Sequence, residues 1–318
     1  MTSRSVPAGV LAIVVMSLAV AGAHPHGPEG RAIALTFDDL PYVAVSSSYL
    51  PGAQRTTSSL LKILAAHRAP AIGFVNEIQL RGGVDREERI ALLRQWIRRG
   101  MLLGNHTYSH PDFNAVSVER FQEEIVKGEE VTRRLLAEKP GAPLFFRHPM
   151  THTGDTREKK EAIEKFLAAR GYRIAPHTIE NSDFVFNRVY ALAVAKRDSA
   201  LATKVRAAYL EFSIAATAFA ETIPPKIFGR DVPQTLLLHA NDLNADALDE
   251  LLKRLEGRGY RFISLEQAMA DPAYQTADTL VSSFGPTWLW RWNKSLGLNV
   301  SFAGDPEPPA WVTEMVGK

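Results

Sequence analysis

The sequence contains no cysteine among its 318 residues. For this chain, that absence excludes thiol catalysis, zinc sites built from cysteine, disulfide bonds and lipid attachment at an N-terminal cysteine. The chain also lacks a large excess of positive or negative charge, since it has 37 Lys and Arg and 35 Asp and Glu. The composition therefore gives no reason to expect nucleic acid or an anionic membrane surface as a partner. Hydrophobic residues make up 46% of the chain, enough for one large α/β domain or two small ones.

No hydrophobic run is long enough for an ordinary membrane span. The apolar residues 10–20 fall short of the roughly 18 residues that a span needs. They follow a positive charge at Arg4 and precede the small residues Ala21-Gly22-Ala23, which is the pattern of a cleaved secretory signal. We therefore predict a signal peptide over residues 1–23, a mature chain that begins at His24, and a secreted or periplasmic protein without a membrane span. The alternative is an uncleaved anchor.

A glycine-rich phosphate loop and internal repeats are also lacking, and the first of these argues against a nucleotide-binding fold. What the chain does have is an alternation of two patterns. Apolar, strand-like runs occupy residues 32–35, 71–75, 101–103, 144–146, 172–175, 235–238 and 260–263. Helical spacing occupies residues 56–68, 86–99, 118–138, 157–170, 245–256 and 265–270. This alternation predicts a parallel sheet, and an irregular or incomplete (β/α) barrel explains it better than an open sheet.

Two carboxylates stand where the first strand ends, at Asp38 and Asp39. In α/β folds, functional sites are built at the carboxyl ends of the strands. Adjacent strand residues point to opposite faces, so the two aspartates should have different roles. The ordinary alternative is a strand end whose aspartate caps the next helix.

Two histidines four residues apart, His106 and His110, follow the strand at residues 101–103. Pro111 disfavours a helical conformation at His110, so we expect the end of a turn there. With Asp39, the histidines make a set of two imidazoles and one carboxylate at the same rim of the barrel. Such a set suits a catalytic divalent ion, with Zn²⁺ expected and Co²⁺, Ni²⁺ or Mn²⁺ as alternatives.

Three further polar residues end or follow strands, namely Arg147, Asp183 and His239. Each has an ordinary structural explanation: an ion pair for Arg147, a helix cap for Asp183 and a core histidine for His239. Their shared position at strand ends favours one functional rim over three separate coincidences.

Five motifs, in order, resemble those of the polysaccharide deacetylase family, the NodB-homology carbohydrate esterases. They are Thr36-Phe37-Asp38-Asp39, His106-Thr107-Tyr108-Ser109-His110, Arg147-His148-Pro149-Met150, Glu180-Asn181-Ser182-Asp183-Phe184 and Leu237-Leu238-His239. The first two are specific, whereas the last three are loose matches that gain weight from their order. The resemblance implies a distorted (β/α) barrel of the NodB type.

The resemblance also implies a role for each matching residue. These roles are Asp38 as general base, His239 as general acid, Asp39, His106 and His110 as metal ligands, Arg147 orienting Asp38, Asp183 holding His239 or Arg147, the Met150 N–H stabilising an oxyanion, and Leu237 lining the pocket for the acetyl methyl. The implied reaction is removal of N- or O-acetyl groups from an acetylated carbohydrate by a metal-dependent hydrolase. Two alternatives are a metal-dependent amidase or imidase for a small amide, and a catalytically silent sugar-binding module.

The chain departs from the family pattern around the substrate groove. His148, Met150 and Thr151 replace residues of the third motif, including the aromatic that lines the groove. Glu180 and Phe184 replace the Asp and Trp of the fourth motif. The reaction type is therefore easier to predict than the substrate.

Domain boundaries follow from the same patterns. We predict a deacetylase-like domain over residues 31–270, a helical insertion over residues 187–220 and a C-terminal extension over residues 271–318. The extension holds Phe284, Trp288, Trp290 and Trp292. These aromatics indicate a flap that packs on the barrel or an aromatic wall for a sugar, and the flap is favoured because aromatics are more often core than site.

Overall fold

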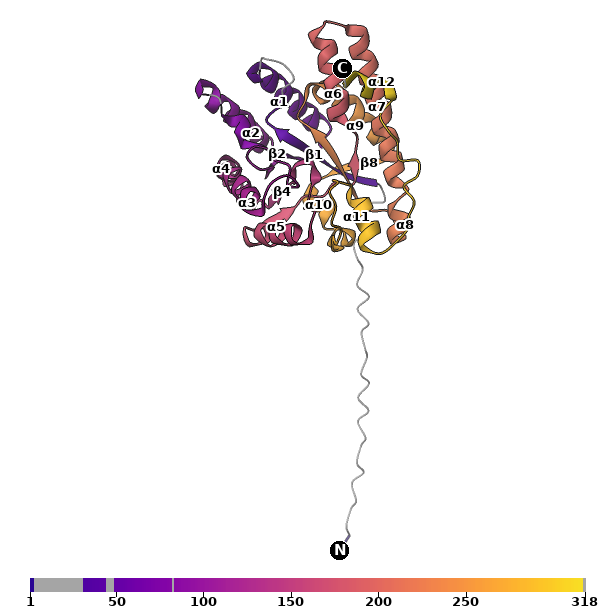
Figure 1. Ribbon diagram of the computed structural model, residues 1–318. Coiled ribbons are helices and arrows are strands. Elements are labelled where there is room, and N and C mark those ends of the chain that lie inside the picture. The colour runs from indigo at the N-terminus through magenta and orange to yellow at the C-terminus, as the bar shows by residue number, and fades with distance from the viewer. Residues whose placement is uncertain (3–30, 44–48, 82, 317–318) are drawn as a thin grey trace.

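The computed structural model describes residues 1–2, 31–43, 49–81 and 83–316. Nearly all of the predicted signal peptide and its cleavage site lie outside these residues. Within the described ranges, strands and helices alternate and every pair of neighbouring strands is parallel (Figure 1). No helix in these ranges is both long and apolar enough to cross a membrane.

The sheet has eight strands in the order β5-β4-β3-β2-β1-β7-β6, with β8 also paired to β1. The strands are β1 (Arg31–Leu40), β2 (Ala71–Val75), β3 (Leu102–Asn105), β4 (Leu144–Phe146), β5 (Tyr172–Ile174), β6 (Ile179–Glu180), β7 (Gln234–His239) and β8 (Tyr260–Ile263). The helices are α1 (Tyr49–Ala66), α2 (Arg86–Arg98), α3 (Val118–Lys127), α4 (Glu130–Leu136), α5 (Arg157–Ala169), α6 (Asp183–Ala195), α7 (Ser199–Glu221), α8 (Pro224–Phe228), α9 (Asp242–Gly257), α10 (Leu265–Met269), α11 (Trp288–Ser295) and α12 (Ala310–Val316).

Strand β1 is the centre of the sheet, because its ten residues pair with three neighbouring strands. Residues 31–34 pair with β8, residues 33–38 with β7 and residues 35–40 with β2. The outermost strands β5 and β6 do not pair with each other among the described residues, so the barrel stays open between them. The prediction of a distorted (β/α) barrel is confirmed.

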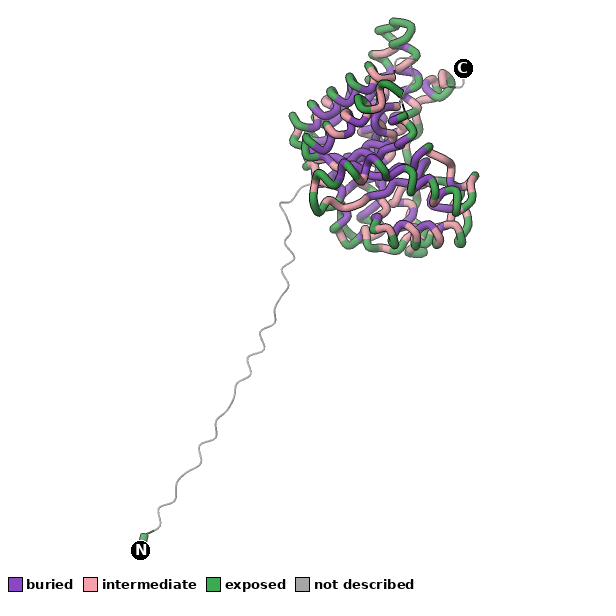
Figure 2. Tube along the Cα trace, turned by 90° about the vertical axis from the view of Figure 1, so that its left-hand side faces the viewer, coloured by how far each residue is buried: buried purple, intermediate pink, exposed green. Residues whose placement is uncertain are grey.

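Buried residues fill the interior of the folded body (Figure 2), and the two faces of β1 enter different parts of this core. Ile33, Leu35 and Phe37 pack into a large cluster with the covering helices, whereas Ala32 and Ala34 join a smaller cluster with residues of β2, β4 and α10. This alternation follows from the period of two in a strand. The smaller side chains face the inside of the curled sheet.

The prediction of a single helix over residues 118–138 is wrong. The structure has two helices there, α3 and α4, with a break at Gly128 and Glu129. A Cβ atom at Gly128 would lie 2.4 Å from the backbone carbon of Thr107 and 2.6 Å from the backbone nitrogen of Tyr108. The break brings the chain against a distant loop, which the helical periodicity of residues 118–138 does not reveal.

The segment predicted as an insertion over residues 187–220 also differs in its boundaries. Helix α6 already begins at Asp183, and α7 starts at Ser199 after a turn in which Arg197 has a φ of 56°. The two helices pack against each other and against α9. The start at Asp183 matters because this helix carries a residue of the candidate site in its first turn.

The C-terminal segment, described over residues 271–316, packs on the barrel. Trp292 is fully buried, with its ring centroid 5.0 Å from that of Tyr274 and 5.3 Å from that of Phe228. Arg291 is also fully buried, and it donates hydrogen bonds to the backbone oxygen of Thr151 and to the carboxylate of Asp278. These contacts make the segment part of the folded body.

Candidate active site

The two aspartates at the end of β1 reach the same cavity, although strand alternation would separate them. The pairing of β1 with β2 shifts register between Phe37 and Leu40, and Asp39 has a φ of 63°. A non-glycine residue in this left-handed region interrupts the pleat. Asp38 therefore keeps the inner face of the strand and is 2% exposed, whereas Asp39 turns toward the rim of the cavity.

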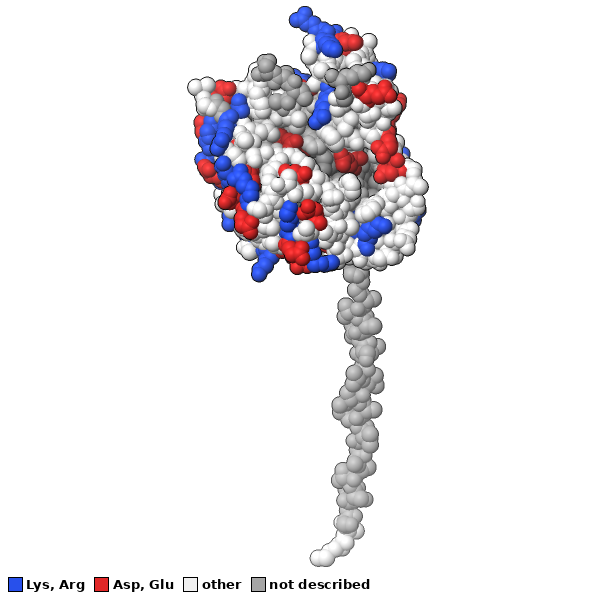
Figure 3. Space-filling view, in the orientation of Figure 1, with Lys and Arg blue, Asp and Glu red and all other residues white. Residues whose placement is uncertain are grey.

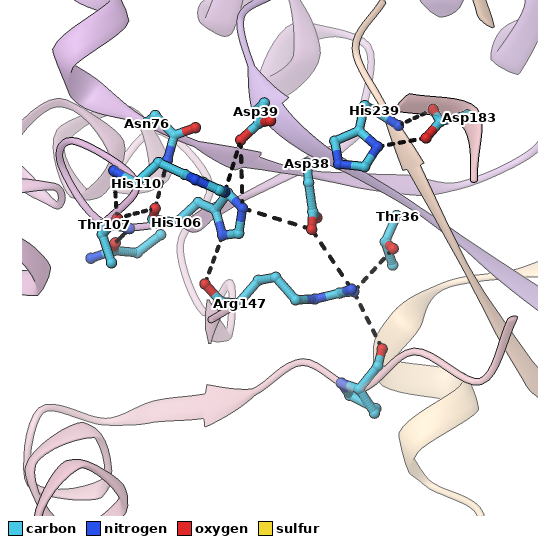
Figure 4. A network of polar contacts seen from close by, with 12 residues as sticks. Thr36, Asp38, Asp39, Asn76, His106, Thr107, His110, Arg147, Asp183 and His239 are labelled. Carbon is cyan, nitrogen blue, oxygen red and sulfur yellow. Dashed lines mark hydrogen bonds and ion pairs between the residues drawn. The ribbon is translucent and has the colours of Figure 1, made fainter. Parts of the chain in front are cut away.

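The segment that carries His106 and His110 is a loop fixed by polar contacts. Asn76 donates to the backbone oxygen of His106 at 2.6 Å, and Glu124 accepts from both the N–H and the hydroxyl of Ser109. His110, just before a proline as the sequence indicates, has a φ of 58°. The loop geometry agrees with the prediction of a turn, and it aims both imidazoles in one direction (Figure 4).

Asp39, His106 and His110 come together as one set of donor atoms. The Nε2 atoms of both histidines lie 3.6 Å from Oδ1 of Asp39, and one donor atom from each residue lies within 4.8 Å of the others. Oδ1 of Asp39 is buried and accepts no hydrogen bond from the described residues. Two imidazole nitrogens and an unpaired carboxylate oxygen fit the donor set of a divalent metal ion.

The tautomer of His106 follows from its partner. Its Nδ1 lies 2.7 Å from the backbone oxygen of Arg147, and a carbonyl oxygen can only accept. Nδ1 therefore carries the proton, and Nε2 presents its lone pair to the cavity. Burial, followed by the nearby positive charges of His110 and Arg147, lowers the pKa of His106 well below its usual value. A neutral imidazole is the form that binds a metal.

Asp38 lies on the inner side of this set and faces Arg147. Its Oδ2 lies 3.8 Å from Nη1 of Arg147 and 3.8 Å from Nε2 of His106, and its Oδ1 has no hydrogen-bond partner among the described residues. Burial raises the pKa of Asp38, while the charges of Arg147 and His239 oppose the rise. Arg147 is itself fixed by Thr36, whose hydroxyl oxygen accepts from Nη2 at 3.0 Å.

His239 ends β7 and is held by Asp183. Its Nδ1 lies 2.6 Å from Oδ1 of Asp183, and its backbone N–H donates to Oδ2 at 2.7 Å. Burial opposes protonation of His239, but the charge and hydrogen bond of Asp183 outweigh it and raise the pKa to about 10. Of the two partners predicted for Asp183, the structure gives it His239.

These side chains line one cavity of about 520 Å³ at the carboxyl ends of the strands. Leu237 and Met150, which the resemblance places near an acetyl group, also line it. Its lining consists of Asp38, Asp39, Val43, His106, His110, Met150, Thr151, Glu180, Phe184, Asn187, Arg188, Leu237, His239 and Gly285. Two predicted site residues, Arg147 and Asp183, do not line the cavity. Arg147 lies beside Asp38 and Asp183 binds His239, and both Asp38 and His239 line it.

Backbone strain is concentrated around this cavity. Eight non-glycine residues in the described ranges have positive φ, and six of them belong to the motif segments: Asp39, Thr107, His110, Met150, Thr151 and Ser182. Such conformations cost about 1–3 kcal/mol each and persist only where the surroundings impose them. Strain gathered in this way is typical of a functional site.

The replaced motif residues separate into two groups. His148 is fully buried beside the rings of Phe121 and Phe146 and does not line the cavity. Thr151 and Met150 do line it, and Met150 is 48% exposed. The third motif therefore contributes a flexible thioether side chain where an aromatic is usual in the family.

Several supporting residues are not predictable from the motifs. Asn241 and Asn244 donate to the Asp183 carboxylate, and Thr36 holds Arg147. Gly285, from the C-terminal segment, meets the third motif so closely that a Cβ there would lie 2.0 Å from the backbone oxygen of Met150. The only signal in the sequence for the two asparagines is their place at the start of a helix, where Asn is a common cap.

A family model described as Polysaccharide deacetylase matches residues 26–162. This part of the chain is similar to that family. A peptidoglycan-N-acetylglucosamine deacetylase of Bacillus cereus is 25% identical over 246 residues, which cover 75% of this chain and 69% of that protein. A chitooligosaccharide deacetylase of Rhizobium leguminosarum bv. trifolii is 36% identical over 104 residues, or 33% of this chain and 40% of that protein.

Among solved structures, a family 4 carbohydrate esterase of Bacillus subtilis, PdaA, has a TM-score of 0.48 at 19% identity, covering 76% of this chain and 82% of that one. A family 4 pseudoenzyme of Bacillus anthracis has a TM-score of 0.49 at 18% identity, covering 76% and 66%.

Proposed function

We propose that the chain is a metal-dependent hydrolase that removes N- or O-acetyl groups from a carbohydrate. The observation that carries this proposal is the cavity in which Asp38, the donor set of Asp39, His106 and His110, and the Asp183-bound His239 face one another. The family's named relatives include deacetylases of peptidoglycan, chitin and chitooligosaccharides.

Asp39, His106 and His110 would hold the metal, with Zn²⁺ as the ion we propose. When bound, a divalent ion polarises the acetyl carbonyl and lowers the pKa of water. The neutral His106 and the unpaired oxygen of Asp39 support this assignment. The carbonyl of Arg147 fixes the His106 ring through Nδ1, a contact of the kind that orients metal-binding histidines.

Asp38 would act as the general base. It is buried beside the metal ligands, and Arg147 lies close enough to favour the ionised carboxylate that can accept a proton. Its free Oδ1 is available to the attacking water, because no hydrogen bond among the described residues occupies that atom. The N–H of Met150 would stabilise the oxyanion, and Leu237 would contact the acetyl methyl.

His239 would act as the general acid. Its contact with Asp183 uses Nδ1, so the proton on Nε2 is free to reach the leaving nitrogen. With a pKa of about 10, His239 is protonated at neutral pH, the state that a proton donor needs. An amine leaves poorly without this proton, so the acid matters most for amide substrates.

Acetate release from an N-acetylated amino-sugar oligomer and from an aryl acetate tests the two roles. Asp38→Asn should lower kcat/KM roughly 10²-fold or more on both substrates, as expected for loss of a general base. His239→Ala should impair the amide more than the ester, because a phenoxide leaves without help. His67→Ala, which removes a largely buried histidine that contacts Asp249 and does not line the cavity, is the matched control and should change neither rate.

The same assay separates the alternatives. Equal losses for His239→Ala on both substrates would refute its role as the acid. Turnover of small amides or imides without turnover of acetylated sugars would favour an amidase, and absence of turnover with a bound metal would indicate a silent sugar-binding module.

We also propose secretion or export to the periplasm, on the pattern of residues 1–23. N-terminal sequencing of exported protein should find His24, whereas Met1 in a membrane fraction would indicate an anchor.

A further inference from the structure

A second cavity of about 240 Å³ adjoins the candidate active site. It lies between α7, β6 and the C-terminal segment, and it shares Glu180 and Gly285 with the first cavity. Because the two cavities have these residues in common, they are direct neighbours.

Aromatic side chains line part of this second cavity. Phe219 of α7 and Phe302 of the C-terminal segment lie with ring centroids 6.0 Å apart and their planes tilted by 57°, and Phe212 and Trp290 also line the cavity. Pro286, Pro306 and Pro308 add apolar surface to the lining. Aromatic rings of this kind offer a surface for the apolar face of a sugar ring.

Every charged side chain that lines the second cavity is acidic. These residues are Glu180, Asp305 and Glu307, and no described Lys, Arg or His is part of the lining. None of the side-chain hydrogen bonds or ion pairs between described residues involves Glu180. On the face drawn in Figure 3, acidic side chains gather on the right, where Figure 1 places α7 and the C-terminal segment. The cavity is complementary to a cation that also has an apolar face.

We propose that this cavity binds a sugar unit with a protonated primary amine, next to the acetylated unit in the active site. The inference rests on the proposed function, because deacetylation of an N-acetylated unit produces such an amine. The enzyme would then prefer a chain that is already partly deacetylated. The surroundings of Asp305 agree with this: burial and the charge of Glu307 raise its pKa, so a cation in the cavity would relieve their repulsion.

Binding of two tetramers to the full chain tests the proposal without relying on catalysis. Isothermal titration should show that tetrameric glucosamine binds more tightly than tetrameric N-acetylglucosamine, and that added salt weakens only the former. The variant Asp305→Asn with Glu307→Gln should weaken glucosamine binding roughly fivefold or more, the size expected for losing one or two partly exposed ion pairs. Neither residue belongs to the proposed catalytic set.

A control with the same change in net charge is Glu123→Gln with Glu161→Gln. Both residues are exposed partners of arginines on α3 and α5, away from the second cavity, and the pair should leave binding unchanged. Equal binding of the two tetramers to the parent, or an unaltered preference in Asp305→Asn with Glu307→Gln, would overturn the proposal. So would a lysine-containing peptide that binds as tightly as tetrameric glucosamine.

Kinetics provide the second readout. For a tetramer with one acetylated unit beside free amines, the double variant should raise KM and leave kcat unchanged, and its activity on the fully acetylated tetramer should match the parent. If the parent released no acetate from either tetramer, the proposed deacetylase function would be refuted. The titration of the two tetramers would then still show whether the second cavity binds amines. If acetate is released but the preference for amines is absent, only the amine site fails.

Discussion

The contact between His239 and Asp183 sets a pH dependence at the scale of single residues. With its pKa raised to about 10, His239 remains a proton donor through neutral pH, so the alkaline limb of kcat/KM should lie near pH 10. In Asp183→Asn the charge that favours the imidazolium is gone and burial remains. Asp38 and Asp39 still favour the imidazolium, but the limb should move to lower pH, and activity at the alkaline end of the profile should fall.

The same pair makes stability depend on pH, and the sign is determined by the raised pKa. The folded state binds the proton of His239 more tightly than the unfolded state does, so the stabilisation is complete below about pH 6.5. It is lost progressively as pH rises toward 10. Denaturant unfolding of the parent at pH 6 and pH 10 should show this loss, and Asp183→Asn should show less of it.

A matched control is Asp249→Asn, which breaks the surface contact between Asp249 and His67. It should leave the alkaline limb where it is in the parent. An Asp183→Asn variant with an unshifted limb would contradict the role of His239 as the proton donor.

At this scale the sequence predicts which residues gather but not how each is oriented. Asp38, Asp39, His106 and His239 are predictable because the carboxyl ends of parallel strands meet at one edge. Strand alternation alone places Asp38 and Asp39 on opposite faces. The register shift and the positive φ of Asp39 bring both to the cavity, and these depend on the pairing of β1 with a strand more than thirty residues away.

At the scale of elements, the break between α3 and α4 makes a prediction about Gly128. A Cβ atom there would meet the backbone of Thr107 and Tyr108, inside the loop that carries the two proposed metal histidines. Backbone atoms cannot move aside as a side-chain tip can. Gly128→Ala should therefore displace the loop, weaken metal binding and reduce kcat/KM roughly tenfold or more, since small misplacements in a site are costly.

Gly257→Ala is the matched control for this substitution. Gly257 ends α9, and a Cβ there would have no atom within 4 Å. Its activity should match the parent, and the free energy of unfolding should rise by about 0.4–1 kcal/mol because alanine restricts the unfolded chain. Metal content and circular dichroism, measured together, separate a displaced loop from a lost fold. Unchanged metal affinity in Gly128→Ala would show that the loop tolerates the displacement.

The helical periodicity predicts α2 and α5 closely but merges α3 with α4. Residues 86–99 and 157–170 each end at a glycine with positive φ, Gly100 and Gly171, which the sequence shows directly. The need for Gly128 comes from a loop that is distant along the chain. Periodicity within one segment carries no information about such a contact.

At the scale of the whole molecule, the alternation of strands and helices predicts the parallel barrel, but not where it opens. The opening lies between β5, which the strand-like run at residues 172–175 predicts, and β6, whose two residues are too few to be recognised from their pattern. The C-terminal segment is a similar case. Its aromatics suggest either core or ligand wall, and the structure divides them, with Trp292 in the core and Trp290 in the second cavity.

The proposed metal should stabilise the whole fold, because its ligands come from separate parts of the chain. Asp39 lies on β1, whereas His106 and His110 follow β3, so an ion bound to all three links segments that unfolding would separate. At a free-ion concentration 100 times the dissociation constant, the free energy of unfolding should rise by about 2.7 kcal/mol. Thermal unfolding after chelation should therefore occur several degrees lower, and added Zn²⁺ should restore it.

Two variants make this measurement specific to the site. His106→Ala and His110→Ala should each bind less metal in elemental analysis and lose most of the Zn²⁺-dependent rise in Tm. His67→Ala, whose imidazole contacts Asp249 and Glu256 on the surface, should keep both. Full metal binding by the first two variants would show that other residues bind the ion. A parent whose Tm is the same with and without the ion would show that no tight site links these segments.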